Sequence, residues 1–178
     1  MVAPIDVDQV ADGQFLREAI ECRTARLAAG RVRPADAREL KALLKGQARA
    51  VARNDQADFL VLDDRMHQHI VTMAGHPNVW RAVEDVKAQL DRVRVLSLED
   101  PSWLATILRQ HEAIVERVLV GDGDAASHAM EAHLRSVFAS IDTIASREPS
   151  YFRGGAPVSR SGAPRASPRP SPPARRSP

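Results

Sequence analysis

The chain has 178 residues, of which 44% are hydrophobic, 4% aromatic and 27% charged, and its formal net charge at pH 7 is +2. This length and composition fit one globular domain with an appendage, and the single cysteine, Cys22, excludes an intramolecular disulfide framework. No apolar run approaches the ~20 residues of a membrane span, and the first residues lack the basic start and apolar stretch of a signal peptide. We therefore expect a cytoplasmic protein without a membrane partner.

The positive charge is concentrated at the carboxyl end of the chain. Residues 153–178 contain six arginines and no acidic residue, so that the +2 of the whole chain leaves −4 for residues 1–152. These arginines are Arg153, Arg160, Arg165, Arg169, Arg175 and Arg176. A body of this charge has no electrostatic footprint for DNA. The Pro/Ser/Arg-rich end predicts a disordered tail, because it offers little apolar surface to bury. The alternative is a weak contact of this tail with nucleic acid or another acidic partner.

Apolar residues recur at helical spacing in six successive segments. We expect helices over about residues 14–29, 34–53, 56–74, 78–98, 101–121 and 122–147. Glycine and proline separate them: Gly30 ends the first, Pro34 suits the first turn of the second, and Gly75 with Pro77 interrupts the pattern after the third. No alternating run of strand length and no internal repeat is present. The pattern predicts an all-α antiparallel bundle.

One aspartate and three histidines on these helices are the strongest candidates for a site. Asp63 and His67 are four residues apart, so one helix projects both side chains from the same face. His111 and His133 each lie among apolar residues at helical spacing and are expected to point inward. A carboxylate and three neutral imidazoles form a good ligand set for a divalent transition metal. On spacing alone, a buried His–carboxylate pair and two core histidines are the commoner arrangement, and Asp64 is the alternative carboxylate.

Four segments resemble, in their order along the chain, the FadR-type C-terminal effector-binding domain (FCD) of GntR-family bacterial transcription regulators. They are FLREAIECRTARLAA, FLVLDDRMHQHI, AGHPNVWRAVEDVKAQLDRVRVLSL and HEAIVERVLVGDGDAASHAMEAHL, and together they cover roughly residues 14–144. Two positions depart from the family pattern: Met66 stands where Phe is usual, and His76 follows Gly75 where Asn is frequent.

The resemblance implies a metal site and an effector site. All four family ligand positions are filled, by Asp63, His67, His111 and His133. Zinc is the preferred ion, with nickel, manganese and iron(II) as alternatives. In related domains the effector is a small carboxylate, such as a sugar acid or another organic acid, and the domain forms a homodimer. Because a guanidinium pairs bidentately with a carboxylate, the candidate effector contacts are the arginines of the matching segments, and their alternative role is a surface salt bridge. These arginines are Arg17, Arg94 and Arg92, of which Arg17 and Arg94 are preferred.

Family regulators carry a winged helix-turn-helix ahead of this domain, and the opening MVAPIDVDQV resembles the last strand of the wing running into the linker. We therefore divide the chain into a linker remnant (1–13), the helical effector-binding domain (14–148) and the disordered tail (149–178). DNA binding is expected only through a winged helix-turn-helix outside these 178 residues. Whether the chain is a truncated regulator or a stand-alone sensor stays open.

The expected function is a metal-containing, carboxylate-sensing and dimerisation domain, not an enzyme. No general base at a recognisable spacing, Gly-rich phosphate loop or nucleophile motif is found. Two alternatives remain: a metal-dependent enzyme that activates a bound water, and a helical interaction or ligand-binding module with structural histidines.

Overall fold

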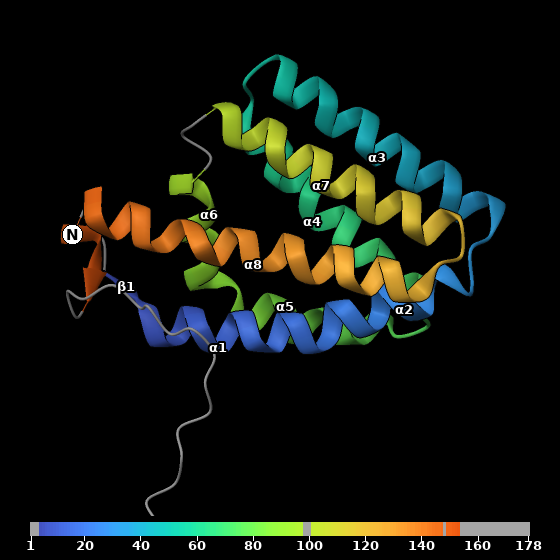
Figure 1. The fold of residues 1–178 in the computed structure, drawn as a ribbon, viewed down its shortest axis with the longest axis horizontal. Helices are drawn as coiled ribbons and strands as arrows, with labels where there is room; N and C mark the ends of the chain where they lie inside the picture. Colours follow the sequence, from blue (N-terminus) through green and yellow to red (C-terminus); the bar gives the residue numbers. More distant parts are fainter. Residues whose placement is uncertain (1–3, 98–100, 148, 154–178) are drawn as a thin grey trace, which may run out of the picture.

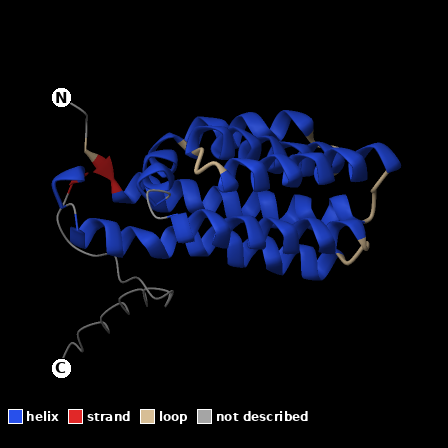
Figure 2. Cartoon of the chain, turned by 90° about the horizontal axis from the view of Figure 1, so that it is seen from above, coloured by secondary structure: helices blue, strands red, loops and turns tan. Residues whose placement is uncertain are grey.

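The computed structural model describes residues 4–97, 101–147 and 149–153. This part of the chain is a bundle of packed helices (Figure 1), which confirms the all-α fold expected from the sequence. Its strands are two short ones, β1 (Ile5–Asp6) and β2 (Phe152–Arg153), which pair in parallel with Ile5 opposite Phe152. Figure 2 shows this pair at one end of the bundle. Most of the expected tail, residues 154–178, lies outside the described residues, whereas its first residues form a 3-10 turn (Pro149–Tyr151) and β2.

The first helical segment begins earlier than the sequence pattern indicated. Helix α1 spans Val7–Arg17, a π-helical turn follows over Glu18–Cys22, and α2 spans Arg23–Ala29. The expected start was Gln14, but the Asp6 side chain accepts from the backbone N–H groups of Asp8 (3.1 Å) and Gln9 (3.3 Å) and caps the helix seven residues sooner. Part of the expected linker therefore belongs to the bundle.

Helices α3 (Pro34–Ala52) and α4 (Gln56–Met73) form an antiparallel hairpin with nearly the predicted bounds. Asp55 caps α4 by accepting from the backbone N–H of Asp58 at 3.0 Å. The two helices approach closely at Gly46, where an added Cβ would lie 3.0 Å from a methyl carbon of Leu62. The absence of a side chain at Gly46 therefore lets α3 pack closely against α4.

The fourth expected helix, residues 78–98, is divided in the structure. A 3-10 turn (Pro77–Val79) leads into α5 (Trp80–Val86), and α6 (Ala88–Ser97) follows after a break at Lys87. Both pieces keep one apolar face inward, which is why the sequence pattern does not show the break. Helices α7 (Pro101–Leu119) and α8 (Gly123–Arg147) complete the bundle, and Gly121 turns the chain between them with φ +80°.

The two larger of the three apolar clusters in the described core lie on either side of a layer of buried polar side chains, and the third cluster is formed by Val71, Trp80 and Val83. Along α4, Phe59 belongs to the cluster near β1 and Met66 to the other cluster, with Asp63 between them. Along α7, Ile107 and Ile114 bracket His111 in the same way. The buried polar and charged residues of this layer include Arg17, Glu21, Gln47, Asp63, His67, Arg94, His111 and His133. No helix in the described part of the chain is both long and apolar enough to cross a membrane.

Candidate metal centre

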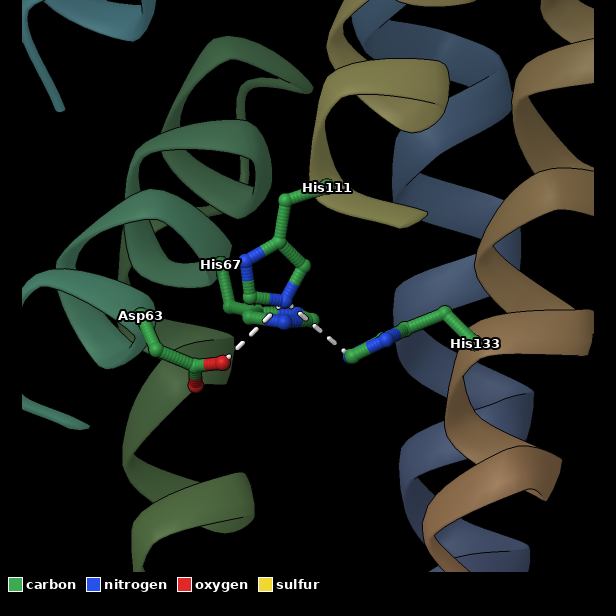
Figure 3. A group of neighbouring side chains, drawn as sticks. All are labelled: Asp63, His67, His111 and His133. Carbon is green, nitrogen blue, oxygen red and sulfur yellow. Dashed lines mark hydrogen bonds and ion pairs between the residues drawn. The ribbon is translucent and has the colours of Figure 1, made fainter. Parts of the chain in front are cut away.

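Helices α4, α7 and α8 bring Asp63, His67, His111 and His133 together in the polar layer (Figure 3). Each residue offers one ligand atom, and these atoms all lie within 4.8 Å of one another. Nε2 of His111 is 3.1 Å from a carboxylate oxygen of Asp63 and 3.4 Å from Nε2 of His133. All four side chains are buried. The four candidate ligands predicted from the sequence therefore converge on one point.

The outer ring nitrogen of each histidine meets an acceptor. Nδ1 of His111 is 2.8 Å from the amide oxygen of Gln47, and Nδ1 of His133 is 3.0 Å from the amide oxygen of Gln110. Nδ1 of His67 contacts the carboxylate of Glu21. Since a carboxylate and an amide oxygen can only accept, a proton on Nδ1 satisfies each of these three contacts.

With the protons on Nδ1, the Nε2 atoms would be free to bind an ion at the centre of the cluster. Nε2 of His67 is fully buried and has no hydrogen-bond partner among the residues that the structure describes. An unpaired buried nitrogen of this kind requires a reason, and a metal ion supplies one. The orientation of Gln47 is fixed independently, because its amide nitrogen donates to the backbone oxygen of Leu62 at 3.2 Å. Three imidazole nitrogens with oriented Nδ1 protons, plus one carboxylate oxygen, fit a divalent transition metal ion.

Arg94 of α6 holds the carboxylate ligand from behind. Its guanidinium contacts Asp63 and lies 3.1 Å from Asp64 and 2.9 Å from Asp91. Burial disfavours the charge of Asp63, but Arg94 and His111 outweigh it and hold the pKa of this carboxyl well below its usual value. Lys87 pairs with Asp64 (2.6 Å) and Asp91 (2.7 Å), which makes the group a closed network of two cations and three anions. Asp63 is therefore ionised and available as a ligand.

Arg17 acts on His67 indirectly, through the carboxylate of Glu21. The π-helical turn that contains Glu21 follows directly after Arg17, and the Nε of Arg17 lies 2.5 Å from the Glu21 carboxylate. Burial raises the pKa of Glu21, but Arg17 and His67 more than offset this and lower it to about 2. An ionised carboxylate at Nδ1 makes His67 a stronger donor through Nε2.

The other two histidines are held in the neutral form. Burial lowers the pKa of His111, although Asp63 acts in the opposite direction. Burial also lowers the pKa of His133 well below its usual value, and the neighbouring His111 and His67 add to this effect. Neutral imidazole is the form that binds metal.

The three arginines expected at an effector site lie in different surroundings. Arg94 lines a small cavity together with Asp63 and His133. Arg17 is buried and its described contacts are with Glu21, so it lies behind His67 and does not line that cavity. Arg92 lines a separate groove near β1.

Of the two neighbouring carboxylates, Asp63 joins the cluster, while Asp64 is partly exposed and pairs with Lys87 and Arg94.

Sequence reasoning missed Glu21, Gln47 and Gln110, which accept from the histidines. Some signal was present: Gln47 occupies an inward position of α3 one heptad after Leu40, and Gln110 directly precedes His111. Glu21 follows Arg17 at i,i+4 spacing, which is compatible with an ordinary surface pair. Only the tertiary structure shows that the pair is buried against His67.

Comparison with known proteins agrees with this fold. Residues 14–136 match the family model of the FCD domain. The chain is 36% identical over 151 residues to the HTH-type transcriptional repressor RspR of Escherichia coli, covering 85% of this chain and 66% of that protein. It is 38% identical over 151 residues to an uncharacterised HTH-type transcriptional regulator of Streptomyces ambofaciens, covering 85% of this chain and 63% of the relative. The chain thus spans just under two thirds of the length of these relatives.

Among solved structures, Escherichia coli McbR/YncC has a similar fold. The TM-score is 0.68 at 16% sequence identity, over 74% of this chain and 63% of that one. At this identity the likeness concerns the fold alone.

Proposed function

Because the chain belongs to the FCD-domain family of GntR-type transcription regulators, we propose that it is the metal-containing, small-carboxylate-sensing and dimerisation domain of such a regulator. The observation that carries the proposal is the convergence of Asp63 with three histidines whose Nδ1 atoms all meet acceptors. A set of core histidines with a structural role has no need for a fully buried Nε2 without a hydrogen-bond partner, which is the state of His67 among the described residues.

The proposed ion is zinc, with nickel, manganese or iron(II) as alternatives that the same ligands accept. Asp63, His67, His111 and His133 would hold it, and Glu21, Gln47 and Gln110 would orient the imidazole rings. A bound divalent ion supplies positive charge for the carboxylate oxygen of an effector. Arg94 adds a second positive charge on the same side of the site.

The proposed regulatory effect follows from where the ligands reside. The four ligands come from α4, α7 and α8, and Arg94 connects Asp63 to α6. An effector at this point contacts several helices at once and favours one arrangement of the bundle over another. In a homodimer, that shift would change the spacing of two DNA-binding domains located in sequence beyond these 178 residues.

We favour a sensor over a metal-dependent enzyme. The relatives are named as transcription regulators, and each carboxylate around the cluster already has a cationic partner. Glu21 pairs with Arg17, Asp63 with Arg94, and Asp64 with both Arg94 and Lys87. The pKa of Glu21 and that of Asp63 are also lowered by these cations, and a carboxylate with a lowered pKa is a poor general base. Turnover of a carboxylate or ester by the metal-loaded chain would favour the enzyme instead.

The test is the metal content of the purified chain, measured by elemental mass spectrometry beside His111→Ala and the control His128→Ala, whose side chain is exposed on α8. We expect near-stoichiometric metal in the wild type and the control, and little in His111→Ala. Added metal should raise the melting temperature of the chelator-treated wild type, since the ion binds the folded state. Absence of metal after reconstitution would leave a helical module with structural histidines.

A further inference from the structure

A small cavity lies beside the proposed metal ligands, and its lining residues limit what can bind there. A cavity of about 10 Å³ adjoins Asp63 and His133, which is the space of roughly one water molecule. Its lining residues are Phe59, Leu60, Asp63, Arg94, Trp103, Ile107 and His133. Any effector that reaches the ligand cluster from this side must therefore fit against these side chains.

The polar members of this lining are contiguous. Arg94 contacts Asp63, and Asp63 and His133 belong to the group whose ligand atoms lie within 4.8 Å of one another. Arg94 is the one arginine or lysine among the described residues that line the cavity. With the proposed metal ion bound, this end of the cavity would suit a single anionic head group.

The rest of the wall is apolar. Phe59 and Ile107 are buried and form its inner part, while Leu60 and Trp103 are partly exposed. Apart from Arg94 and His133, the indole N–H of Trp103 is the one hydrogen-bond donor among the described side chains of the lining. Among the described residues, no lining side chain carries a hydroxyl or amide group. Hydroxyl groups of a bound molecule would lose water here without gaining partners.

We infer that the effector is a short monocarboxylate with a compact aliphatic or aromatic tail, and not a polyhydroxylated sugar acid. This inference rests on the proposed function. The carboxylate faces the ligand cluster and Arg94, and the tail packs against Phe59 and Ile107. Binding enlarges the cavity by displacing Leu60 and Trp103, because these partly exposed side chains can move outward without opening the buried core.

The experiment uses the full chain loaded with metal, after its metal content has been measured. Isothermal titration compares 4-methylpentanoate with gluconate, which have equal numbers of carbon atoms, and phenylacetate with 2-phenylethanol, which lacks the charge. We expect 4-methylpentanoate to bind at least about tenfold more tightly than gluconate, since an apolar wall discriminates against added hydroxyl groups by factors on the order of 10 to 100. Phenylacetate should bind and 2-phenylethanol should not.

Two variants test whether the apolar lining of the cavity causes the preference for 4-methylpentanoate over gluconate. Leu60→Asn places an amide in the lining and should reduce the preference for 4-methylpentanoate over gluconate several-fold. Leu62→Asn is the matched control, because Leu62 is also on α4 and partly exposed but packs against Gly46 of α3. It should leave the ratio of the two dissociation constants unchanged.

The outcomes separate the inference from the proposed function. Gluconate binding as tightly as 4-methylpentanoate, or more tightly, overturns the inference while the carboxylate sensor stands. Equal effects of Leu60→Asn and Leu62→Asn on the ratio overturn the assignment of the tail to this wall. If no acid binds the metal-loaded chain, both the inference and the carboxylate-sensing function fail, whereas a metal-free chain contradicts the metal site itself.

Discussion

The carboxylate of Glu21 accepts a hydrogen bond from Nδ1 of His67, which follows 46 positions later in the chain. The contact joins the π-helical turn after α1 to the middle of α4, and Arg17 pairs with the same carboxylate. His67 is thus held by a charged acceptor, whereas His111 and His133 are held by neutral amides. Glu21 is therefore the strongest of the three groups that orient the proposed ligands.

We predict that Glu21→Gln weakens metal binding roughly 10- to 100-fold, because replacing an outer acceptor of a ligating histidine has effects of this size. The amide keeps the shape of the side chain but removes the charge that strengthens His67 as a donor. Competition with a chelator of known affinity gives the change in dissociation constant.

Glu18→Gln is the matched control for this prediction. Glu18 lies in the same π-helical turn and pairs with Arg135 at 3.0 Å, but it makes no contact with the histidines among the described interactions. Its metal affinity should equal that of the wild type. Equal losses in both variants would mean that the charge of the turn matters and the contact with His67 does not.

The metal-free chain should lose stability as the pH falls below the unfolded histidine pKa of about 6.5. In the folded state the pKa of His111 and that of His133 are lowered by burial, so the unfolded chain binds more protons in this range. The free energy of unfolding then falls by up to about 1.4 kcal/mol per pH unit for each of the two groups. Chemical denaturation between pH 7.5 and 5.5, with chelator present, measures this slope.

His133→Gln should reduce that slope by the contribution of one histidine, up to about 1.4 kcal/mol per pH unit. The variant removes one of the two side chains that must stay neutral in the folded state. His128→Gln, at an exposed position of the same helix, should leave it unchanged. A wild-type stability that is flat over this range would show that the two imidazoles are protonated in the folded state.

Local signals in the sequence mark the four residues of the cluster as candidates, and the resemblance to the FCD family predicts that they form one site. Asp63 and His67 share a helix face, and His111 and His133 replace apolar residues in otherwise regular helical patterns. The positions of most helix ends can also be predicted from nearby residues, because glycine, proline and capping residues mark them. These features need no knowledge of which helix packs against which.

What the sequence does not predict depends on contacts between distant segments. The partner of His111 is Gln47, 64 positions away, and nothing near either residue specifies the pairing. The division of the expected helix 78–98 at Lys87 is similar, because Lys87 pairs with Asp64 of α4 as well as with Asp91. The apolar wall of the cavity also combines residues of α4 and α7 that no single segment reveals.

A stability prediction tests how closely α2 and α8 pack. A Cβ added at Gly123 would lie 2.8 Å from the backbone oxygen of Arg26, so Gly123→Ala forces the start of α8 away from α2. We expect a loss of about 1–3 kcal/mol in the free energy of unfolding, typical of overpacking. Urea denaturation measures it. Gly30→Ala is the control, since its nearest atom would be 3.7 Å away, and it should change stability by less than about 1 kcal/mol.

The last prediction concerns the arginines beyond residue 153, which are Arg160, Arg165, Arg169, Arg175 and Arg176. If the alternative of a weak tail contact holds, the full chain should retard DNA only at low salt and without sequence preference, because these side chains are the concentrated positive charge of an otherwise acidic protein. Five phosphate contacts at most limit the slope of log K against log salt to about −4.5. A full-length variant with all five changed to Gln should not retard DNA. Sequence-specific retardation by that variant would show that residues 1–153 contain a DNA-reading element.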